Sequence, residues 1–115
     1  MKEYKIYHNP RCTKSREGLK ILTDHGIEPE IIEYLNNPPG HSELDDILTK
    51  LGKEPEEILR KNEDVFKEYF KGKTLDRDGW IKAMIKFPKL IERPIVVKGD
   101  KAVLGRPPEN INILF

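Results

Sequence analysis

Apolar positions along the chain change between the spacing of strands and the spacing of helices. In residues 3–7 every second side chain is apolar, with Tyr4 and Ile6 on one face, which predicts a short strand. After a turn, apolar residues recur at helical spacing from about Thr13 up to Gly26. Residues 30–35 contain two isoleucines and a tyrosine, which favour β-structure, and predict a second strand. Because a strand, a helix and a strand form a right-handed βαβ unit, we expect the two strands to be parallel.

The middle of the chain, about residues 41–88, shows helical periodicity throughout. Ser42 and Asp45 match a capping box, and apolar residues follow at helical spacing as far as Gly52. Further helical segments are predicted at residues 55–60, 63–70 and 76–87, with Trp80 in the core of the last. We therefore expect a helical insertion between the second and third strands.

Strand-like spacing returns after Pro88. Residues 94–98 and 101–104 are apolar runs separated by Gly99-Asp100, which is typical of a β-hairpin with a two-residue loop. Pro107-Pro108 then opens a last short helix that runs to Leu114. The order of elements predicts an α/β fold, a thioredoxin-like mixed four-stranded sheet with a helical insertion. We expect one domain over residues 1–115.

Composition restricts where the protein acts. The 115 residues are 37% hydrophobic and 36% charged, which describes a water-exposed surface over a modest core. The longest apolar runs are a few residues, far below the roughly 20 that a membrane helix needs. Lys2, Glu3 and Lys5 leave no apolar signal-peptide core at the N-terminus. We expect a cytoplasmic protein without a membrane partner.

Charge and ligand spacing exclude further classes. Lysine and arginine total 21 against 20 acidic residues, so we expect no direct nucleic-acid partner. His25 and His41 lack cysteine or carboxylate residues at ligand spacing, and we expect no metal. We also expect a monomer.

Cys12 is the only cysteine, so the chain cannot form an internal disulfide. From composition alone it could equally be a buried apolar residue, but its place at the predicted start of a helix favours chemistry. Backbone N–H groups and the helix dipole stabilise negative charge there, so we expect a lowered thiol pKa and a cradle for an oxyanion.

Two positions after Cys12 restrict that chemistry. Gly18 stands where a phosphatase-type loop would need an arginine, which disfavours hydrolysis of phosphate esters. Ser15 stands where the second cysteine of a Cys-x-x-Cys pair would be. A two-electron reduction by this thiol therefore requires a second sulfur from another molecule.

Residues 8–16, His-Asn-Pro-Arg-Cys-Thr-Lys-Ser-Arg, resemble the active-site loop of the glutaredoxin-coupled arsenate reductase family. Three later segments resemble that family's later motifs in the same order. They are 59–62 (Leu-Arg-Lys-Asn), 90–97 (Leu-Ile-Glu-Arg-Pro-Ile-Val-Val) and 104–107 (Leu-Gly-Arg-Pro). The resemblance covers essentially the whole chain, and four motifs in register are far more specific than any one alone.

The resemblance implies that Cys12 is the catalytic nucleophile and that Arg60, Arg93 and Arg106 bind arsenate. Guanidinium groups suit this role because they bind oxyanions bidentately and neutralise their charge. Without the resemblance, each arginine would be read as a solvated surface residue. The implied reaction reduces arsenate to arsenite with glutathione as co-substrate, glutaredoxin as partner and no tightly bound cofactor.

Five further residues are assigned supporting roles. Ser15 is expected either to donate a hydrogen bond to the thiolate or to cap the helix. His8 is expected either to be a cation beside Cys12 at mildly acid pH or to close the strand. Asn9 is expected to shape the turn, and Arg16 matches the family loop. Pro94 resembles the cis-proline that faces the active cysteine in thioredoxin-like folds.

Two alternatives belong to other classes. A Spx-like transcription regulator shares the fold and binds RNA polymerase, although such proteins often carry the Cys-x-x-Cys pair that is absent here. A monothiol thiol-transfer protein would form a mixed disulfide on Cys12 without reducing arsenate. We rank the reductase first.

Overall fold

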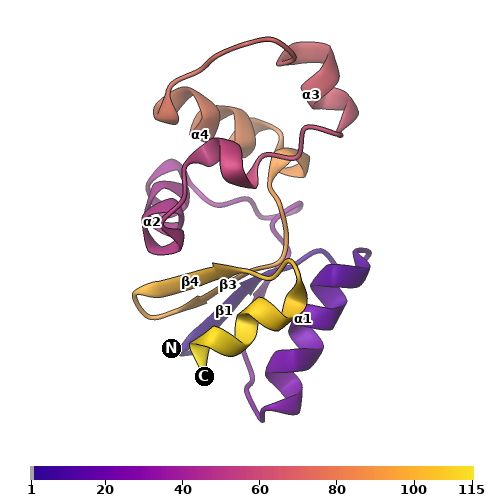
Figure 1. Ribbon diagram of the computed structural model, residues 1–115, viewed down its shortest axis with the longest axis vertical. Helices are drawn as coiled ribbons and strands as arrows, with labels where there is room; N and C mark the ends of the chain where they lie inside the picture. The colour runs from indigo at the N-terminus through magenta and orange to yellow at the C-terminus, as the bar shows by residue number, and fades with distance from the viewer. Residues whose placement is uncertain (1) are drawn as a thin grey trace. The chain divides into compact units, whose positions relative to one another are not determined.

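The computed structural model describes residues 2–115 of the chain and divides it into two compact units (Figure 1). The first unit contains the chain up to Asn37 together with Arg93–Phe115, and the second is Pro38–Glu92. The helical insertion predicted at about residues 41–88 falls inside the second unit.

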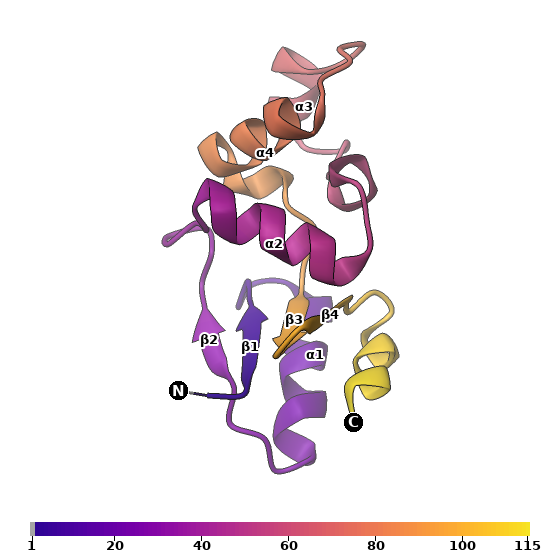
Figure 2. The same ribbon diagram turned by 90° about the vertical axis from the view of Figure 1, so that its left-hand side faces the viewer.

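The first unit is built on a four-stranded sheet of order β2-β1-β3-β4. Its strands are β1 (Tyr4–Tyr7), β2 (Glu30–Ile32), β3 (Ile95–Lys98) and β4 (Lys101–Leu104). The central strand β1 pairs in parallel with β2 and antiparallel with β3, which forms a hairpin with β4 (Figure 2). The predicted mixed sheet, parallel βαβ unit and terminal hairpin are all confirmed.

One face of this sheet is covered by α1 (Thr13–Asp24) and by η3 (Pro108–Leu114), a 3-10 helix, which contact each other. Ile6 of β1 lies opposite Val96 of β3, so both side chains point to the same face. The buried cluster there consists of Tyr4, Ile6, Leu22, Val96, Ile111 and Leu114. This packing fixes the position of α1, which begins directly after Cys12.

Two predicted boundaries are wrong for local reasons. The second strand ends at Ile32 instead of residue 35, because the amides of Asn36 and Asn37 both donate to the Glu33 carbonyl in a turn. The capping box at Ser42 is also wrong. Helix α2 (His41–Leu51) begins two residues earlier than a cap at Ser42 would allow, with Gly40 as its N-cap and a 3.0 Å bond from the Leu44 amide to the Gly40 carbonyl.

The second unit is helical, as its periodicity predicts. It contains α2, η1 (Pro55–Ile58), α3 (Asp64–Tyr69), α4 (Arg77–Lys86) and η2 (Pro88–Leu90). The buried side chains of α4 include Trp80, which is 3% exposed and confirms the predicted core position. The helix predicted at residues 55–60 stops at Ile58, because Leu59 is extended and forms an antiparallel bridge with Ile91.

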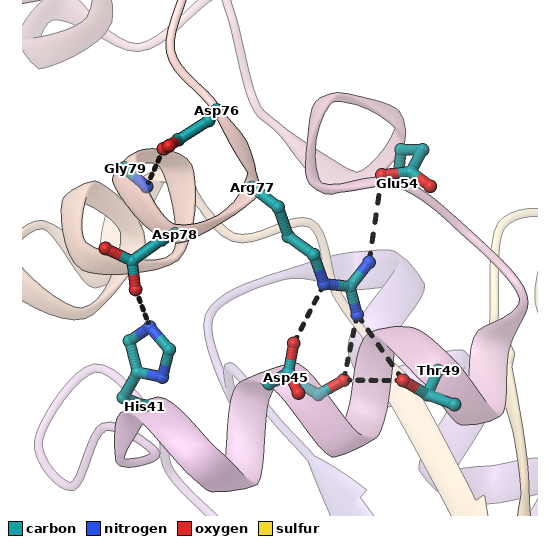
Figure 3. A network of polar contacts seen from close by, with 8 residues as sticks. All are labelled: His41, Asp45, Thr49, Glu54, Asp76, Arg77, Asp78 and Gly79. Carbon is teal, nitrogen blue, oxygen red and sulfur yellow. Dashed lines mark hydrogen bonds and ion pairs between the residues drawn. The ribbon is translucent and has the colours of Figure 1, made fainter.

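Polar side chains connect α2 to the start of α4 (Figure 3). Arg77 donates from Nε to Asp45 Oδ1 at 2.8 Å and from Nη2 to the Asp45 carbonyl at 3.1 Å. The same guanidinium reaches Thr49 Oγ1 at 3.4 Å and Glu54 at 3.7 Å. Asp78, at the first turn of α4, lies 2.6 Å from Nε2 of His41 at the first turn of α2. Arg77 of α4 is thus joined to α2 and to the loop before η1.

Asp78 also meets Lys82 one helical turn further along α4, at 3.0 Å. Hydrogen bonds from Lys82 and then from His41 lower the pKa of the Asp78 carboxyl.

Within residues 2–115, no set of histidine, cysteine and carboxylate side chains is arranged to hold a metal ion. No helix in that range combines the length and apolar character needed to cross a bilayer.

Candidate active site

Cys12 is the N-cap residue of α1, a helix of 12 residues. Strand β1 ends at Tyr7, and the His8 amide still bonds to the Ile32 carbonyl of β2 at 2.8 Å. The chain then turns, with the Cys12 amide donating to the Asn9 carbonyl at 3.0 Å. The cysteine is buried, at 9% exposure. A thiol at this position lies beside the unbonded N–H groups of the first helical turn, which favour negative charge.

A buried polar contact holds the two ends of the Cys12 loop together. Ser15 is fully buried, and its Oγ lies 2.7 Å from Nδ1 of His8, which is 5% exposed. The Asn9 amide donates to the same Oγ at 3.0 Å. The alternative in which Ser15 caps the helix is wrong, because the N-cap is Cys12 and the Ser15 hydroxyl faces His8 and Asn9.

Of the two roles expected for His8, the cation beside Cys12 is disfavoured by burial. Burial lowers the pKa of the imidazole below 6.5, since a buried ring loses hydration of its charged form. The negative charge of Glu33 partly opposes this shift, and the positive charge of Arg16 adds to it. The net direction is downward, so the ring is neutral at neutral pH and is disfavoured as a cation at mildly acid pH.

Asn9 and Arg16 shape the outer side of the loop. Asn9 Oδ1 accepts from the Arg11 amide at 3.0 Å, an arrangement that stabilises a turn. Arg16 donates from Nη1 to the Pro10 carbonyl at 3.0 Å and from Nη2 to Thr13 Oγ1 at 3.2 Å. The Arg16 guanidinium therefore spans the loop on either side of Cys12.

Arg93 and Arg106 are brought together although 13 positions separate them. Nη1 of Arg106 donates to the Arg93 carbonyl at 3.2 Å, and the Gly105 amide donates to the Pro94 carbonyl at 2.8 Å. The Arg93–Pro94 peptide bond is cis, as the resemblance implies. The Arg106–Pro107 bond is cis as well, which the sequence analysis did not predict.

Close packing places Pro94, the residue after Arg93, against α1, the helix whose N-cap is Cys12. A Cβ atom on Gly18 of α1 would lie 2.9 Å from Pro94 Cγ and 3.0 Å from Ile111 Cδ1. These distances are shorter than ordinary contacts, so α1 and Pro94 touch without space for a side chain. This contact is not among those expected from the sequence. The available signal was a glycine inside a helical pattern, where glycine costs about 1 kcal/mol relative to alanine.

Arg60 belongs to the second unit, where two carboxylates form ion pairs with its guanidinium and balance its positive charge. Its Nη1 lies 2.9 Å from Glu63 Oε2, and its Nε lies 3.5 Å from Glu92 Oε1. Its amide bonds to the Leu90 carbonyl at 2.8 Å, beside the bridge between Leu59 and Ile91. Sequence reasoning did not foresee these carboxylates, and the role of Arg60 as an arsenate ligand stays a prediction.

A mixed sheet whose first strand leads through a cysteine into a helix, with a cis-proline before its third strand, defines a thioredoxin-like protein. The chain belongs to the ArsC family, whose model matches residues 7–114. It is 46% identical to an arsenate reductase of Neisseria meningitidis serogroup B over the full length of both chains. It is 47% identical to the uncharacterized protein YfgD of Escherichia coli K12, covering 96% of this chain and 94% of that one.

A solved structure shows the same fold at high similarity. The arsenate reductase from Vibrio cholerae aligns with a TM-score of 0.94 and 42% identity, covering 99% of this chain and 98% of that chain. The thioredoxin-like sheet expected from the sequence is therefore confirmed.

Proposed function

We propose that this protein is an arsenate reductase that takes its electrons from glutathione and glutaredoxin. The observation that carries the proposal is the full-length similarity to a protein named arsenate reductase. The geometry of the Cys12 loop supports it, because a buried thiol at a helix N-terminus suits attack on an oxyanion.

In this proposal arsenate is bound by cationic and N–H groups around Cys12. Arg93 and Arg106 contribute guanidinium groups from adjacent backbone segments, joined by the bond from Arg106 Nη1 to the Arg93 carbonyl. Arg60 is proposed as the third cation. Such groups stabilise the charge that develops on the oxygens as sulfur attacks arsenic. The contact between Gly18 and Pro94 supports the assignment, because it ties Arg93 to the helix that begins after Cys12.

The proposed reaction proceeds in three steps. The Cys12 thiolate attacks arsenic(V), a sulfur–arsenic bond forms, and one arsenate oxygen takes up protons and leaves as water. A glutathione thiolate then attacks the Cys12 sulfur. The sulfur–arsenic bond breaks, its electron pair passes to arsenic, arsenite leaves, and a disulfide between Cys12 and glutathione remains. Glutaredoxin removes the glutathione by thiol–disulfide exchange and returns Cys12 to the thiol.

An external thiol is essential to this scheme because Cys12 is the only cysteine of the chain. Glutathione therefore acts as a co-substrate, and the proposal includes no tightly bound cofactor. A cytoplasmic setting belongs to the proposal, since thiol reductants keep cysteines reduced there.

The test measures arsenite formed from arsenate by the purified protein with glutathione and glutaredoxin. We expect turnover by the wild type and none by Cys12→Ser, with unchanged circular dichroism and thermal unfolding. Arsenite production by a folded Cys12→Ser variant would reject the scheme.

Mass spectrometry of the same reactions separates the alternatives. The scheme requires a Cys12–glutathione disulfide that accumulates with arsenate when glutaredoxin is withheld. A disulfide that forms without arsenite release would favour the thiol-transfer protein. Retention of RNA polymerase by a protein without turnover would favour the transcription regulator.

A further inference from the structure

The second unit carries an open groove whose lining residues play no part in the proposed reaction. The groove has a volume of about 560 Å³ and is formed by α3, α4 and the segments that follow them. Three aromatic residues and three lysines line it: Tyr69, Phe70, Phe87, Lys73, Lys82 and Lys86. We call this feature the basic aromatic groove.

The aromatic side chains of the groove form a preorganised wall. The rings of Tyr69 and Phe87 are stacked with centroids 5.8 Å apart, and Phe70 meets Phe87 edge-on at 5.9 Å. Gly79 and Ala83, one turn apart on α4, also line the groove and leave it hollow because neither has a bulky side chain. Tyr69 is 49% exposed, so a large aromatic surface faces water.

The charge of the groove has one sign. Lys82 and Lys86 lie one turn apart on α4, and Lys73 comes from the loop after α3. Among the residues that the structure describes, no carboxylate lines the groove, although Asp78, one turn before Lys82 on α4, pairs with Lys82 at 3.0 Å. Lys86 Nζ lies 5.6 Å from the centre of the Phe87 ring. Since the whole chain has a net charge of only +1, three lysines at one groove are a local concentration.

We propose that the basic aromatic groove binds an acidic segment of a partner protein. An apolar or aromatic side chain of that segment packs against Tyr69 and Phe87, while neighbouring carboxylates pair with Lys73, Lys82 and Lys86. Aromatic residues at the centre of an interface, with complementary charges around them, are the usual source of affinity and orientation. This inference is independent of the proposed arsenate chemistry.

Size and charge favour a protein segment over other anions. A volume of about 560 Å³ fits one anchoring side chain with its neighbours and exceeds what an inorganic anion needs. A small anion would make no use of the aromatic wall. Nucleic-acid interfaces use extended basic surfaces, whereas this chain balances 21 basic against 20 acidic residues.

The test uses a fluorescent synthetic peptide with a central tryptophan between runs of glutamate, titrated with the full-length protein. Fluorescence anisotropy gives the dissociation constant. We expect it to rise at least tenfold for the Lys82→Gln/Lys86→Gln double variant and at least fivefold for Tyr69→Ala. Lys89→Gln, an exposed lysine outside the groove, is the matched control and should change it by less than twofold.

Two further probes separate the contributions of charge and ring. A peptide with serine in place of tryptophan should bind at least fivefold more weakly, and a lysine-flanked peptide should not bind. Thermal unfolding verifies each variant, and the lysine variants test the proposal even if Tyr69→Ala unfolds. The proposal is overturned if the glutamate peptide does not bind, if the double variant binds it as well as the wild type, or if oligothymidylate binds in its place.

Discussion

Gly18 and Pro94 are in direct contact: a Cβ atom at position 18 would lie 2.9 Å from Cγ of Pro94. A Cβ atom on Gly105 would lie 2.9 Å from the same Cγ, and Ile111 Cδ1 is 3.0 and 3.1 Å from the two positions. Pro94 is therefore held between two glycines of distant segments. The contact also explains why position 18 cannot hold the arginine of a phosphatase-type loop.

We predict that alanine at either glycine destabilises the first unit. Overpacking a tight site costs about 1–3 kcal/mol, whereas alanine gains about 1 kcal/mol over glycine inside a helix. The net decrease in the free energy of unfolding should therefore be smaller for Gly18→Ala, in α1, than for Gly105→Ala, which lies outside the helices. Urea unfolding of both variants measures the difference.

Gly40→Ala is the control for these glycine variants. Nothing lies within 4 Å of a Cβ at Gly40. The Gly40→Ala variant should therefore lose stability only through the preference for glycine over alanine at an N-cap, by at most about 1 kcal/mol. Ile111→Val removes the Cδ1 atom and should cost less in the Gly105→Ala background than in the wild type. Additive losses would show that the close contact is not the cause.

Ser15→Ala should lower the free energy of unfolding by about 2–3 kcal/mol, because it leaves one buried and one half-buried group without their partner. These groups are Nδ1 of His8 and the amide of Asn9. Ser42→Ala, at the only other serine and exposed, should change stability by less than about 0.5 kcal/mol. Equal effects at both serines would contradict the role assigned to the buried hydroxyl.

His8 should make stability depend on pH in the acid range. Its pKa in the folded protein is lowered from 6.5, so the unfolded chain takes up a proton first as the pH falls. The contribution of neutral His8 is complete above the unfolded pKa and is lost as the pH falls from there toward the folded pKa. Urea unfolding between pH 7.5 and pH 5 should therefore show a steeper loss in the wild type than in His8→Asn.

The titration of His8 can also be followed directly. Its ring protons, assigned by NMR through the His8→Asn spectrum, should titrate with a midpoint below 6.5. A midpoint above 6.5 would mean that the folded protein favours the cation and would reverse the expected pH dependence.

Arg77→Met should destabilise the second unit by about 1–2 kcal/mol, since it removes charge-assisted bonds that join two helices. The expected loss of stability is modest because the Arg77 and Asp45 side chains are 35% and 49% exposed. Lys50→Met removes a pair with Asp46 inside α2 alone and should cost about 0.3–0.5 kcal/mol. A double-mutant cycle of Arg77→Met with Asp45→Asn should show coupling, whereas zero coupling would exclude their interaction as the cause.

Arg93→Ala should lower kcat/KM for arsenate about 10²–10³-fold if its guanidinium stabilises developing charge. Arg106→Ala should act similarly and also remove the bond to the Arg93 carbonyl. Arg77→Met, which removes a guanidinium of the network in Figure 3, is the control and should retain kcat/KM within a few-fold when folded. Wild-type efficiency in Arg93→Ala would remove Arg93 from the site.

Much of the fold could be predicted because its signals are local. Gly99-Asp100 between two apolar runs predicts the hairpin of β3 and β4, and Gly52 ends α2 with φ of 66°. The predicted helix at residues 55–60 is too long because a distant partner decides where it ends. Leu59 leaves the helical conformation to bridge Ile91, 32 positions away, and no periodicity around residue 59 signals that pairing.

The candidate site was predictable in part for the same reason. The start of α1 follows from local sequence, so the position of Cys12 could be inferred. The carboxylates around Arg60 could not, because Glu92 approaches it only through the bridge between Leu59 and Ile91. The link between Arg93 and Arg106 likewise depends on how β3 and β4 pair.

The sequence by itself determined the order of strands and helices, the lone thiol at a helix start and the need for an external sulfur. These depend on periodicity, turn residues and a count of cysteines. The tertiary structure alone decided the lowered pKa of His8, the contact of Gly18 with Pro94 and the basic aromatic groove. Burial and close packing depend on atoms from segments far apart in the chain, and a pattern of neighbouring residues does not encode their distances.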